Sequence, residues 1–234
     1  LKKADKSDSK IIEFESLYSM DGDFSPVREI VRLAKKYNAL TYLDEVHAVG
    51  IYGNRGSGVA EQENVMNDID ILQGTLAKAF GVMGGYITGK KNLVDFIRSN
   101  ASGFIFTTSI PPCLAAGAYA AIRHLKFSST ERKKLLSVVT SLKKTLKKAG
   151  INFLDHGSHI IPVIVGDAKL CTQASKLLLD NYDIYVQPIN FPTVPVGTER
   201  LRLSASPLHS DEMISKLARA LKEVFNELNI KLAA

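Results

Sequence analysis

A lysine surrounded by small residues is the first candidate for chemistry in this sequence. Lys78 lies within GTLAKAFG (residues 74–81), after the apolar run 69–72 and before a second strand-like run, 86–88. We expect a tight turn between two buried strands, in which the stem of the lysine is held and its ammonium is partly desolvated. Desolvation favours the neutral amine, which attacks aldehydes, so Lys78 predicts a carbonyl cofactor bound as a Schiff base.

An aspartate and a histidine upstream of this turn support the same chemistry. Residues 41–43 form a strand-like run that ends in Asp44, and His47 follows in the next loop. In α/β proteins ligands bind at the carboxyl ends of parallel strands, where pyridoxal phosphate requires a carboxylate to keep its ring nitrogen protonated. Taken singly, Asp44 would be a loop cap and His47 a satisfied loop histidine. The lysine turn downstream makes the combination more specific.

Composition and charge are those of an ordinary globular protein. The chain has 234 residues, 45% of them hydrophobic and 23% charged, with a net charge of +6. The lysines of residues 132–148 fit the wet face of an amphipathic helix, and no aromatic residues interleave with them, which disfavours nucleic-acid binding. No apolar run is long enough to span a membrane, and the glycine-rich loop 50–60 lacks the Gly-Lys-Ser/Thr of a nucleotide-triphosphate site. Cys113 and Cys171 have no metal-ligand spacing, so we expect reduced thiols and no metal.

The elements that must position these residues alternate between strands and helices. Strands are predicted at residues 11–15, 39–43, 69–72, 86–88, 104–107, 159–165, 184–187 and 200–204. Helices are predicted from Ser25, as the cap, to about residue 38, then at 91–100 and 113–126, in a basic stretch ending at Gly150, and at 169–181 and 211–229. The first strand–helix–strand unit predicts a parallel pair with a right-handed connection.

Five segments carry a resemblance to a known family: YSMDGDFSPV (18–27), TYLDEVHAVGIYGNRGSGVAE (41–61), GTLAKAFGVMGGYITG (74–89), GFIFTTSIPP (103–112) and YVQPINFPTVPVGTERLRLS (185–204). Together they resemble the α-oxoamine synthases, a family of pyridoxal phosphate enzymes, over residues 11 to 225. Ala77 departs from the family pattern, which has glycine or serine there, but it is small enough to preserve the lysine turn.

The resemblance implies an α/β fold of the fold-type-I, aminotransferase-like class. Residues 1–112 would be the later part of the large cofactor-binding sheet domain, 113–150 connecting helices, and 151–234 a small α+β carboxyl-terminal domain. The architecture implies a homodimer with active sites at the subunit interface. We expect the chain to be the carboxyl-terminal portion of a longer enzyme, from the bacterial cytoplasm or the mitochondrial matrix.

The resemblance also assigns roles around the cofactor, position by position. Lys78 would form the Schiff base with pyridoxal 5'-phosphate and remove a proton from bound glycine. Asp44 would pair with the ring nitrogen, and His47 would hydrogen-bond the ring hydroxyl oxygen, with Ser19 near the same edge. Phosphate contacts are assigned to Thr75 and, in the neighbouring subunit, to Thr107 and Thr108. Without the resemblance, each threonine would more commonly be a strand-end hydroxyl bonded to backbone.

Substrate contacts are implied on the strand 200–204 and the loop before it. Arg202 would bind the glycine carboxylate, because a planar guanidinium suits bidentate recognition. Thr193 would contact the acyl substrate. Arg200, on the same strand face, has a weaker claim to a substrate contact, and a solvated or structural pair is expected for it instead.

The implied reaction is a decarboxylative condensation of glycine with an acyl-CoA. The segment PINFPTVPVGTERLR favours succinyl-CoA over the acyl-CoAs of the other branches of the family, which make 8-amino-7-oxononanoate, 2-amino-3-ketobutyrate or 3-ketosphinganine. Two alternatives stay open: a synthase with a different acyl-CoA, and an inactive folding unit or pseudo-subunit. The presence of Lys78, Asp44 and His47 speaks against the latter.

Overall fold

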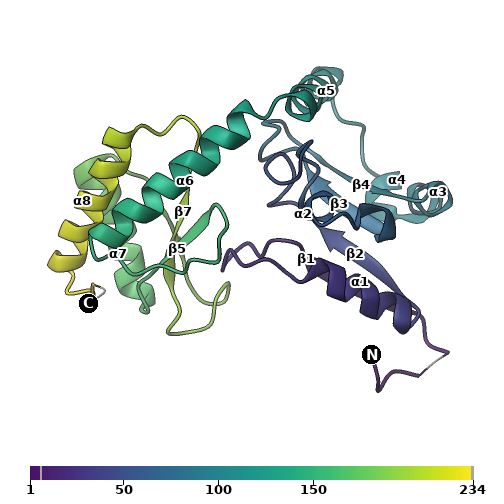
Figure 1. Cartoon of the computed structure of the whole chain (residues 1–234), viewed down its shortest axis with the longest axis horizontal. Helices are drawn as coiled ribbons and strands as arrows, with labels where there is room; N and C mark the ends of the chain where they lie inside the picture. The colour runs from purple at the N-terminus through teal and green to yellow at the C-terminus, as the bar shows by residue number, and fades with distance from the viewer. Residues whose placement is uncertain (6, 233–234) are drawn as a thin grey trace. The chain divides into compact units, whose positions relative to one another are not determined.

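A four-stranded sheet carries the first half of the chain in the order β1-β2-β3-β4. Its strands are β1 (Lys10–Glu15), β2 (Ala39–Asp44), β3 (Ile71–Thr75) and β4 (Gly85–Gly89). The first three are parallel, and β4 runs antiparallel to β3. Helix α1 (Val27–Lys36) connects β1 to β2 and runs alongside them (Figure 1). The parallel strand–helix–strand unit predicted at this end of the chain is therefore confirmed.

The computed structural model describes residues 1–5 and 7–232. The chain divides into two compact units, the first made of residues 1–18 and 24–129. The second takes residues 19–23 and the chain described from Thr130 onward. Within the described ranges, no helix combines the length and the apolar character needed to cross a membrane.

The remaining elements of the first unit are short, except for one long helix. They are α2 (Val59–Gln62), the 3-10 turn η1 (Met66–Asp68), α3 (Lys91–Asn100), α4 (Ser102–Ile105) and α5 (Pro112–Phe127). Proline begins α5, where its missing N–H costs no hydrogen bond. Ala118 and Leu125 of α5 pack with Val49, Leu76 and Phe80, so this helix covers the turns that follow β2 and β3.

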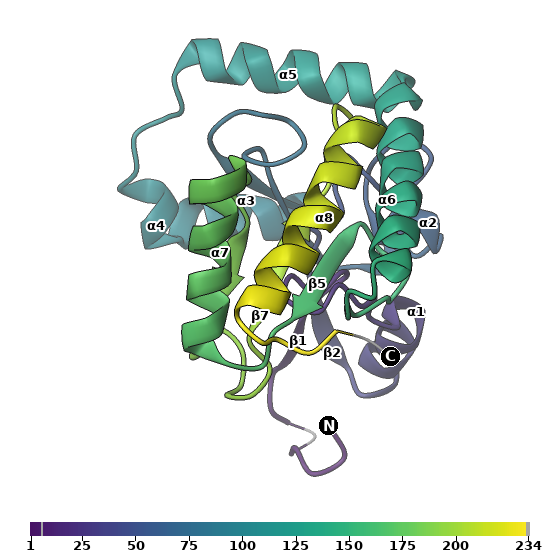
Figure 2. The same ribbon diagram turned by 90° about the vertical axis from the view of Figure 1, so that its left-hand side faces the viewer.

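The second unit is a three-stranded antiparallel sheet covered by three helices. The strands β5 (Ile160–Ile164), β6 (Gln187–Ile189) and β7 (Arg200–Ser204) lie in the order β5-β7-β6. Helices α6 (Thr130–Lys148), α7 (Ala168–Tyr182) and α8 (Asp211–Glu227) lie side by side on one face of this sheet (Figure 2). Apolar side chains fill the layer between, including Leu146, Ile161, Leu178, Leu201 and Phe225, each fully buried.

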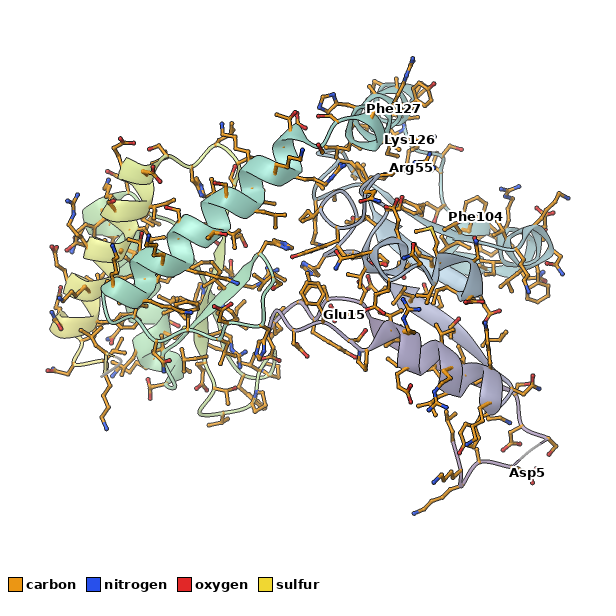
Figure 3. All side chains as sticks on the ribbon, in the orientation of Figure 1. Asp5, Glu15, Arg55, Phe104, Lys126 and Phe127 are labelled. Carbon is orange, nitrogen blue, oxygen red and sulfur yellow. The ribbon has the colours of Figure 1, made fainter. Side chains whose placement is uncertain are left out.

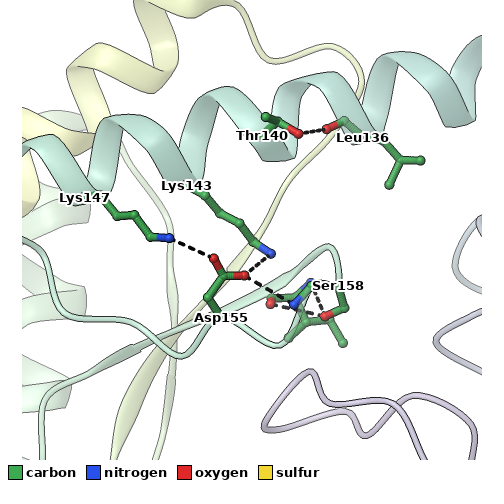
Figure 4. A network of polar contacts seen from close by, with 8 residues as sticks. Leu136, Thr140, Lys143, Lys147, Asp155 and Ser158 are labelled. Carbon is green, nitrogen blue, oxygen red and sulfur yellow. Dashed lines mark hydrogen bonds and ion pairs between the residues drawn. The ribbon is translucent and has the colours of Figure 1, made fainter.

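Asp155 holds the loop before β5 against helix α6 (Figure 4). Its carboxylate accepts from Lys143 Nζ at 2.7 Å and Lys147 Nζ at 3.1 Å, and Oδ1 also accepts from the Gly157 N–H. The hydrogen bond from Lys143 is the main reason that the pKa of Asp155 falls to about 2. The basic face of α6, which was predicted to be solvated, therefore also binds the loop that leads into β5.

An early segment of the chain, residues 19–23, is built into the second unit. The buried guanidinium of Arg200 donates through Nη1 to the Asp21 carboxylate and, at 3.2 Å, to the Met20 carbonyl oxygen. Gly22 has φ +75°, and a Cβ there would lie 2.9 Å from the Ile160 carbonyl oxygen. A glycine is therefore required where the segment passes β5. Of the two roles expected for Arg200, a solvated or a structural pair, the structure has the structural pair.

Two predicted strands differ from the structure. Residues 104–107 do not form a strand: α4 and the turn after it are closed by local bonds such as Phe106 N–H to Ser102 O at 3.1 Å. Residues 184–186 follow the C-terminal cap of α7 instead, and the Ile184 N–H donates to Leu178 O at 3.0 Å past the left-handed Asp183. The ladder of β6 consequently begins at Gln187.

The predicted cap of α1 is also wrong. The helix begins at Val27 rather than Pro26, and no side chain caps it. Ser25 is buried, and its hydroxyl has no hydrogen-bond partner in the described part of the chain.

Candidate active site

Asp44 occupies the predicted position at the carboxyl end of β2. Its Oδ1 accepts from the Val46 N–H at 2.6 Å, and its Oδ2 accepts from Gln73 Nε2 at 3.2 Å. The Gln73 amide oxygen in turn accepts from the Tyr42 hydroxyl at 2.5 Å. This chain of bonds fixes the orientation of the Gln73 amide, and through it the rotamer of Asp44.

Gln73 was not singled out from the sequence. It is a polar residue within the otherwise buried run of β3, and β2 and β3 are parallel with Asp44 opposite Gln73. The signal available in the sequence was a single amide within an apolar strand, where the preceding strand ends in a carboxylate.

The lysine turn lies between β3 and β4, as predicted, but the side chain of Lys78 is exposed. The turn is closed by bonds from Leu76 N–H to Gly84 O and from Val82 N–H to Leu76 O, both 2.9 Å. Leu76 and Phe80 take the buried positions, and the three residues between them are exposed. The predicted desolvation is therefore wrong for this chain by itself, and β4, with no buried residue, is not the second buried strand expected.

The turn that bears Lys78 packs against the loop that follows Asp44. A Cβ added to Gly50 would lie only 2.3 Å from the Cβ of Ala79, and Gly50 has φ +83°. His47 lies between Asp44 and Gly50 and is partly buried. The first unit thus brings together the aspartate, the histidine and the lysine turn.

Glu45 is a second residue that the sequence reasoning missed. It follows Asp44 directly, and its side chain is 0% exposed. Burial raises the pKa of the Glu45 carboxyl. The hydrogen bonds that it accepts from Ala60, Ser16 and Val59 lower the pKa, but the net change is upward. A charged residue directly after an apolar strand was its only signal in the sequence.

The predicted phosphate threonines make local hydrogen bonds. The hydroxyl of Thr75 accepts from the Ala77 N–H at 3.1 Å and donates to Gly84 O at 3.4 Å, which stabilises the lysine turn. Thr75 also lines a cavity of about 640 Å³ together with Arg98 and Phe104. Thr107 donates to the Gly103 carbonyl oxygen, and both Thr107 and Thr108 are exposed.

The predicted substrate residues lie in the second unit. Arg202 is at the centre of β7, opposite Pro162 on one side and Gln187 on the other. It lines a cavity of about 530 Å³ that also has His209 and Lys216 in its wall. Arg202 therefore faces a space large enough for a small carboxylate.

The other two predicted contacts of this unit are Ser19 and Thr193. Ser19 is partly buried in the segment held by Arg200, and Thr193 is exposed in the turn before β7. The Thr193 N–H closes that turn by donating to the Asn190 carbonyl oxygen at 2.9 Å.

His159 precedes β5 and is 9% exposed. Its burial, followed by the charges of Arg202 and Lys143, lowers its pKa to about 4. Burial of this kind favours the neutral imidazole.

Residues 1–221 match the family model described as aminotransferase class I and II. The 5-aminolevulinate synthase of Rickettsia bellii (strain RML369-C) is 55% identical over 234 residues, which cover 100% of this chain and 56% of the relative. That of Rhizobium meliloti (strain 1021) is 59% identical over 223 residues, 95% of this chain and 55% of the relative. The chain thus spans a little over half the length of these relatives.

Solved structures share the fold. Serine palmitoyltransferase from S. paucimobilis with a bound PLP–myriocin aldimine superposes with a TM-score of 0.91 at 30% identity, over 97% of this chain and 57% of that one. An 8-amino-7-oxononanoate synthase from Francisella tularensis gives a TM-score of 0.79 at 21% identity, over 95% and 64% of the two chains. The predicted fold class, aminotransferase-like α/β, is confirmed.

Proposed function

The chain belongs to the aminotransferase class I and II family, and on this basis we propose that it carries most of the active site of a 5-aminolevulinate synthase. Such an enzyme condenses glycine with succinyl-CoA and releases coenzyme A, carbon dioxide and 5-aminolevulinate. One observation carries the proposal: the carboxylate at the end of β2 and the lysine turn after β3 are packed together through Gly50 and Ala79, in a chain 55–59% identical to proteins of that name.

The donor set of the first unit fits pyridoxal phosphate. A carboxylate has about four acceptor positions, and Asp44 uses two of them for Val46 and Gln73, so it can also accept from a protonated ring nitrogen. Lys78 presents an exposed amine for the aldehyde carbon, and His47 lies in the turn between them. When bound, the cofactor withdraws electrons from the α-carbon of an attached amino acid. The role of Asp44 is to keep the ring nitrogen protonated, and that of Lys78 is to accept the α-proton.

Phosphate binding is the proposed role of the threonines. Thr75 lies at the base of the lysine turn, where its hydroxyl and the neighbouring N–H groups suit an anion. Thr107 and Thr108 would reach the phosphate of a second subunit. Their segment is apolar and exposed: Phe104 is 59% and Phe106 86% exposed.

A homodimer is the proposed assembly, because the first unit exposes large apolar side chains on neighbouring helices. Phe127 at the end of α5 is 78% exposed and Tyr119 in the same helix 67% (Figure 3 labels Phe104 and Phe127). Exposed apolar residues in such number are typical of a surface that another chain covers.

Substrate recognition is assigned to the second unit. Arg202 would hold the glycine carboxylate in a bidentate pair, because its guanidinium lines a cavity and carries a permanent charge. Thr193 would contact the succinyl group, and Ser19 would contact the edge of the cofactor ring. Arg200 is left out of this role, since its guanidinium is already engaged with Asp21 and backbone carbonyls.

The test is an assay for 5-aminolevulinate with the purified protein, pyridoxal phosphate, glycine and succinyl-CoA. Product should form with the native sequence and not with Lys78→Ala. A panel of pimeloyl-, acetyl- and palmitoyl-CoA distinguishes the other synthases of the family, and preference for one of them would overturn the substrate assignment. A protein that neither forms product nor takes up the cofactor would be an inactive unit.

A further inference from the structure

Glu45 joins three segments of the first unit through one buried carboxylate. Its Oε2 accepts from the Ser16 hydroxyl at 2.5 Å and from the Val59 N–H at 3.0 Å, while Oε1 accepts from the Ala60 N–H at 2.8 Å. Ser16 directly follows β1, and Val59 and Ala60 begin α2. Three of the about four acceptor positions of the Glu45 carboxylate are therefore occupied by donors, and this implies a fixed rotamer for the side chain.

The backbone of Glu45 fixes the turn that bears His47. Its N–H donates to the Gln73 carbonyl oxygen at 2.9 Å, and its carbonyl oxygen accepts from the N–H groups of Ala48 and Val49 at 2.8 and 2.9 Å. The same residue therefore ties the turn to β3 on one side and closes it around His47 on the other. Asp44 is the preceding residue, so its position depends on the same peptide.

The glycine-rich loop passes directly over this carboxylate. Gly58 has φ +113°, and a Cβ there would lie 2.5 Å from the carboxyl carbon of Glu45. The loop is closed by bonds from Gly58 N–H to Tyr52 O at 3.0 Å and from Gly50 N–H to Gly56 O at 2.7 Å. Its other end, Gly50, is the residue that packs against Ala79 beside Lys78.

We propose that Glu45 is a positioning residue for the cofactor site: it sets the His47 turn through its own peptide and the Lys78 turn through the loop 50–58. This inference rests on the proposed function only for the identity of the ligand. The chain of contacts runs from the Glu45 carboxylate through Val59 and Gly58 to Gly50 and Ala79, all within the first unit. The glycine-rich loop thereby acquires a role other than nucleotide binding.

The test compares Glu45→Gln with Glu61→Gln. Glu61 is a matched control, because its carboxylate holds the far side of the same loop through the N–H groups of Arg55 and Ser57 and does not bond the His47 turn. The amide of Glu45→Gln turns a donor toward one of the three N–H and O–H groups that now bond the carboxylate. The affinity of the Glu45→Gln variant for pyridoxal phosphate, measured by absorbance titration, should be roughly tenfold to a hundredfold lower than that of the native protein. This is the loss expected when hydrogen bonds to a charged group are removed.

A second measurement needs no cofactor. In the protein without pyridoxal phosphate, the NMR signals of the His47 ring should move in Glu45→Gln and stay in place in Glu61→Gln, at a temperature where both are folded. A purely structural role would lower thermal stability in both variants and leave these signals unchanged. That result, or equal cofactor affinity in Glu45→Gln and native protein, would overturn the inference.

Two further controls keep the test decisive. If Glu45→Gln does not fold, Ser16→Ala removes one of the three donors and should show the same changes at smaller size. If the native protein binds no pyridoxal phosphate, the proposed function fails, while the His47 signals still report on the role of Glu45.

Discussion

Gln73 Nε2 lies 3.2 Å from Asp44 Oδ2, and the two residues are register partners in the parallel pair of β2 and β3. The strand pairing that builds the sheet therefore also places a neutral donor beside the carboxylate. Because an amide carries no charge, it orients Asp44 without competing with a cationic ring nitrogen as a lysine or arginine would.

Replacing Gln73 by leucine tests this orientation. The change leaves Tyr42 without its acceptor and Asp44 without one donor. Pyridoxal phosphate affinity should therefore fall by about tenfold, the low end of the worth of a hydrogen bond to a charged group. Absorbance titration gives the affinity, and Gln62→Leu, at the exposed end of α2, is the control. An unchanged affinity would mean that Asp44 is held by Val46 without help.

Asp44→Asn should weaken catalysis far more than folding. An amide cannot keep the ring nitrogen protonated, so exchange of the glycine α-proton should slow by roughly 100-fold or more, as for loss of one electrostatic contact in an active site. Mass spectrometry of glycine in deuterated water measures the exchange. Asp70→Asn is the matched control, because that carboxylate bonds Thr41 at the opposite end of the sheet. Near-normal exchange in Asp44→Asn would remove the assignment.

Lys78 should be the residue that holds the cofactor. Reduction of the pyridoxal phosphate complex with borohydride, followed by peptide mapping, should place the pyridoxyl group on Lys78 and not on the exposed Lys90 or Lys91. Lys78→Ala should fold normally, since the side chain is exposed and the turn is held by backbone bonds. A label on another lysine would refute the assignment.

The two arginines of β7 should respond differently to the same change. Arg202→Leu should raise the glycine KM by roughly 10- to 100-fold and leave cofactor affinity intact, because it removes a carboxylate partner. Arg200→Leu should instead lower the free energy of unfolding by about 1–3 kcal/mol, since it breaks the bonds to Asp21, Met20 and Thr198. Glycine titrations and chemical denaturation separate the two effects, and equal glycine KM values would show that another residue binds the carboxylate.

His159 predicts a loss of stability on mild acidification. The pKa of His159 is about 4 in the folded protein, against 6.5 for an ordinary histidine such as that of the unfolded chain. As the pH falls, the unfolded chain therefore takes up the proton first. The stabilisation is complete above pH 6.5 and is lost as the pH falls toward 4, at up to about 1.4 kcal/mol per pH unit. Chemical denaturation across this range should show a slope that His159→Gln reduces and the exposed His156→Gln does not. An identical slope in native protein and His159→Gln would contradict the assignment.

Much of the framework could be predicted because it depends on local pattern. Apolar residues at helical spacing gave α1, α7 and α8, and the strand that ends in Asp44 was evident from its composition. The run Phe-Ile-Phe at residues 104–106 resembles a strand in composition, but no described strand pairs with it. Local hydrogen bonds instead form the short helix α4 and the turn after it. Periodicity reports which side chains are apolar, and not whether a neighbouring strand exists.

The sequence led to the proposed ligating residues of the candidate site and not to the residues that support them. Motif positions led to Asp44, His47 and Lys78, whereas Gln73 and Glu45 act through contacts between segments that lie far apart in the sequence. The exposure of Lys78 could not be foreseen either, because a turn of small residues fixes the backbone path and leaves open which side of it is covered.

The capture of residues 19–23 by the second unit has a consequence for synthesis on the ribosome. Asp21 and Arg200 are separated by 179 positions, so at roughly 5–20 residues per second the aspartate is made roughly 10–35 seconds before its partner. During that interval the first sheet can form, but the segment that bears Ser19 has nothing to bind. The second unit is therefore completed by residues made well before the rest of it, and a fragment that began at Thr130 would lack them.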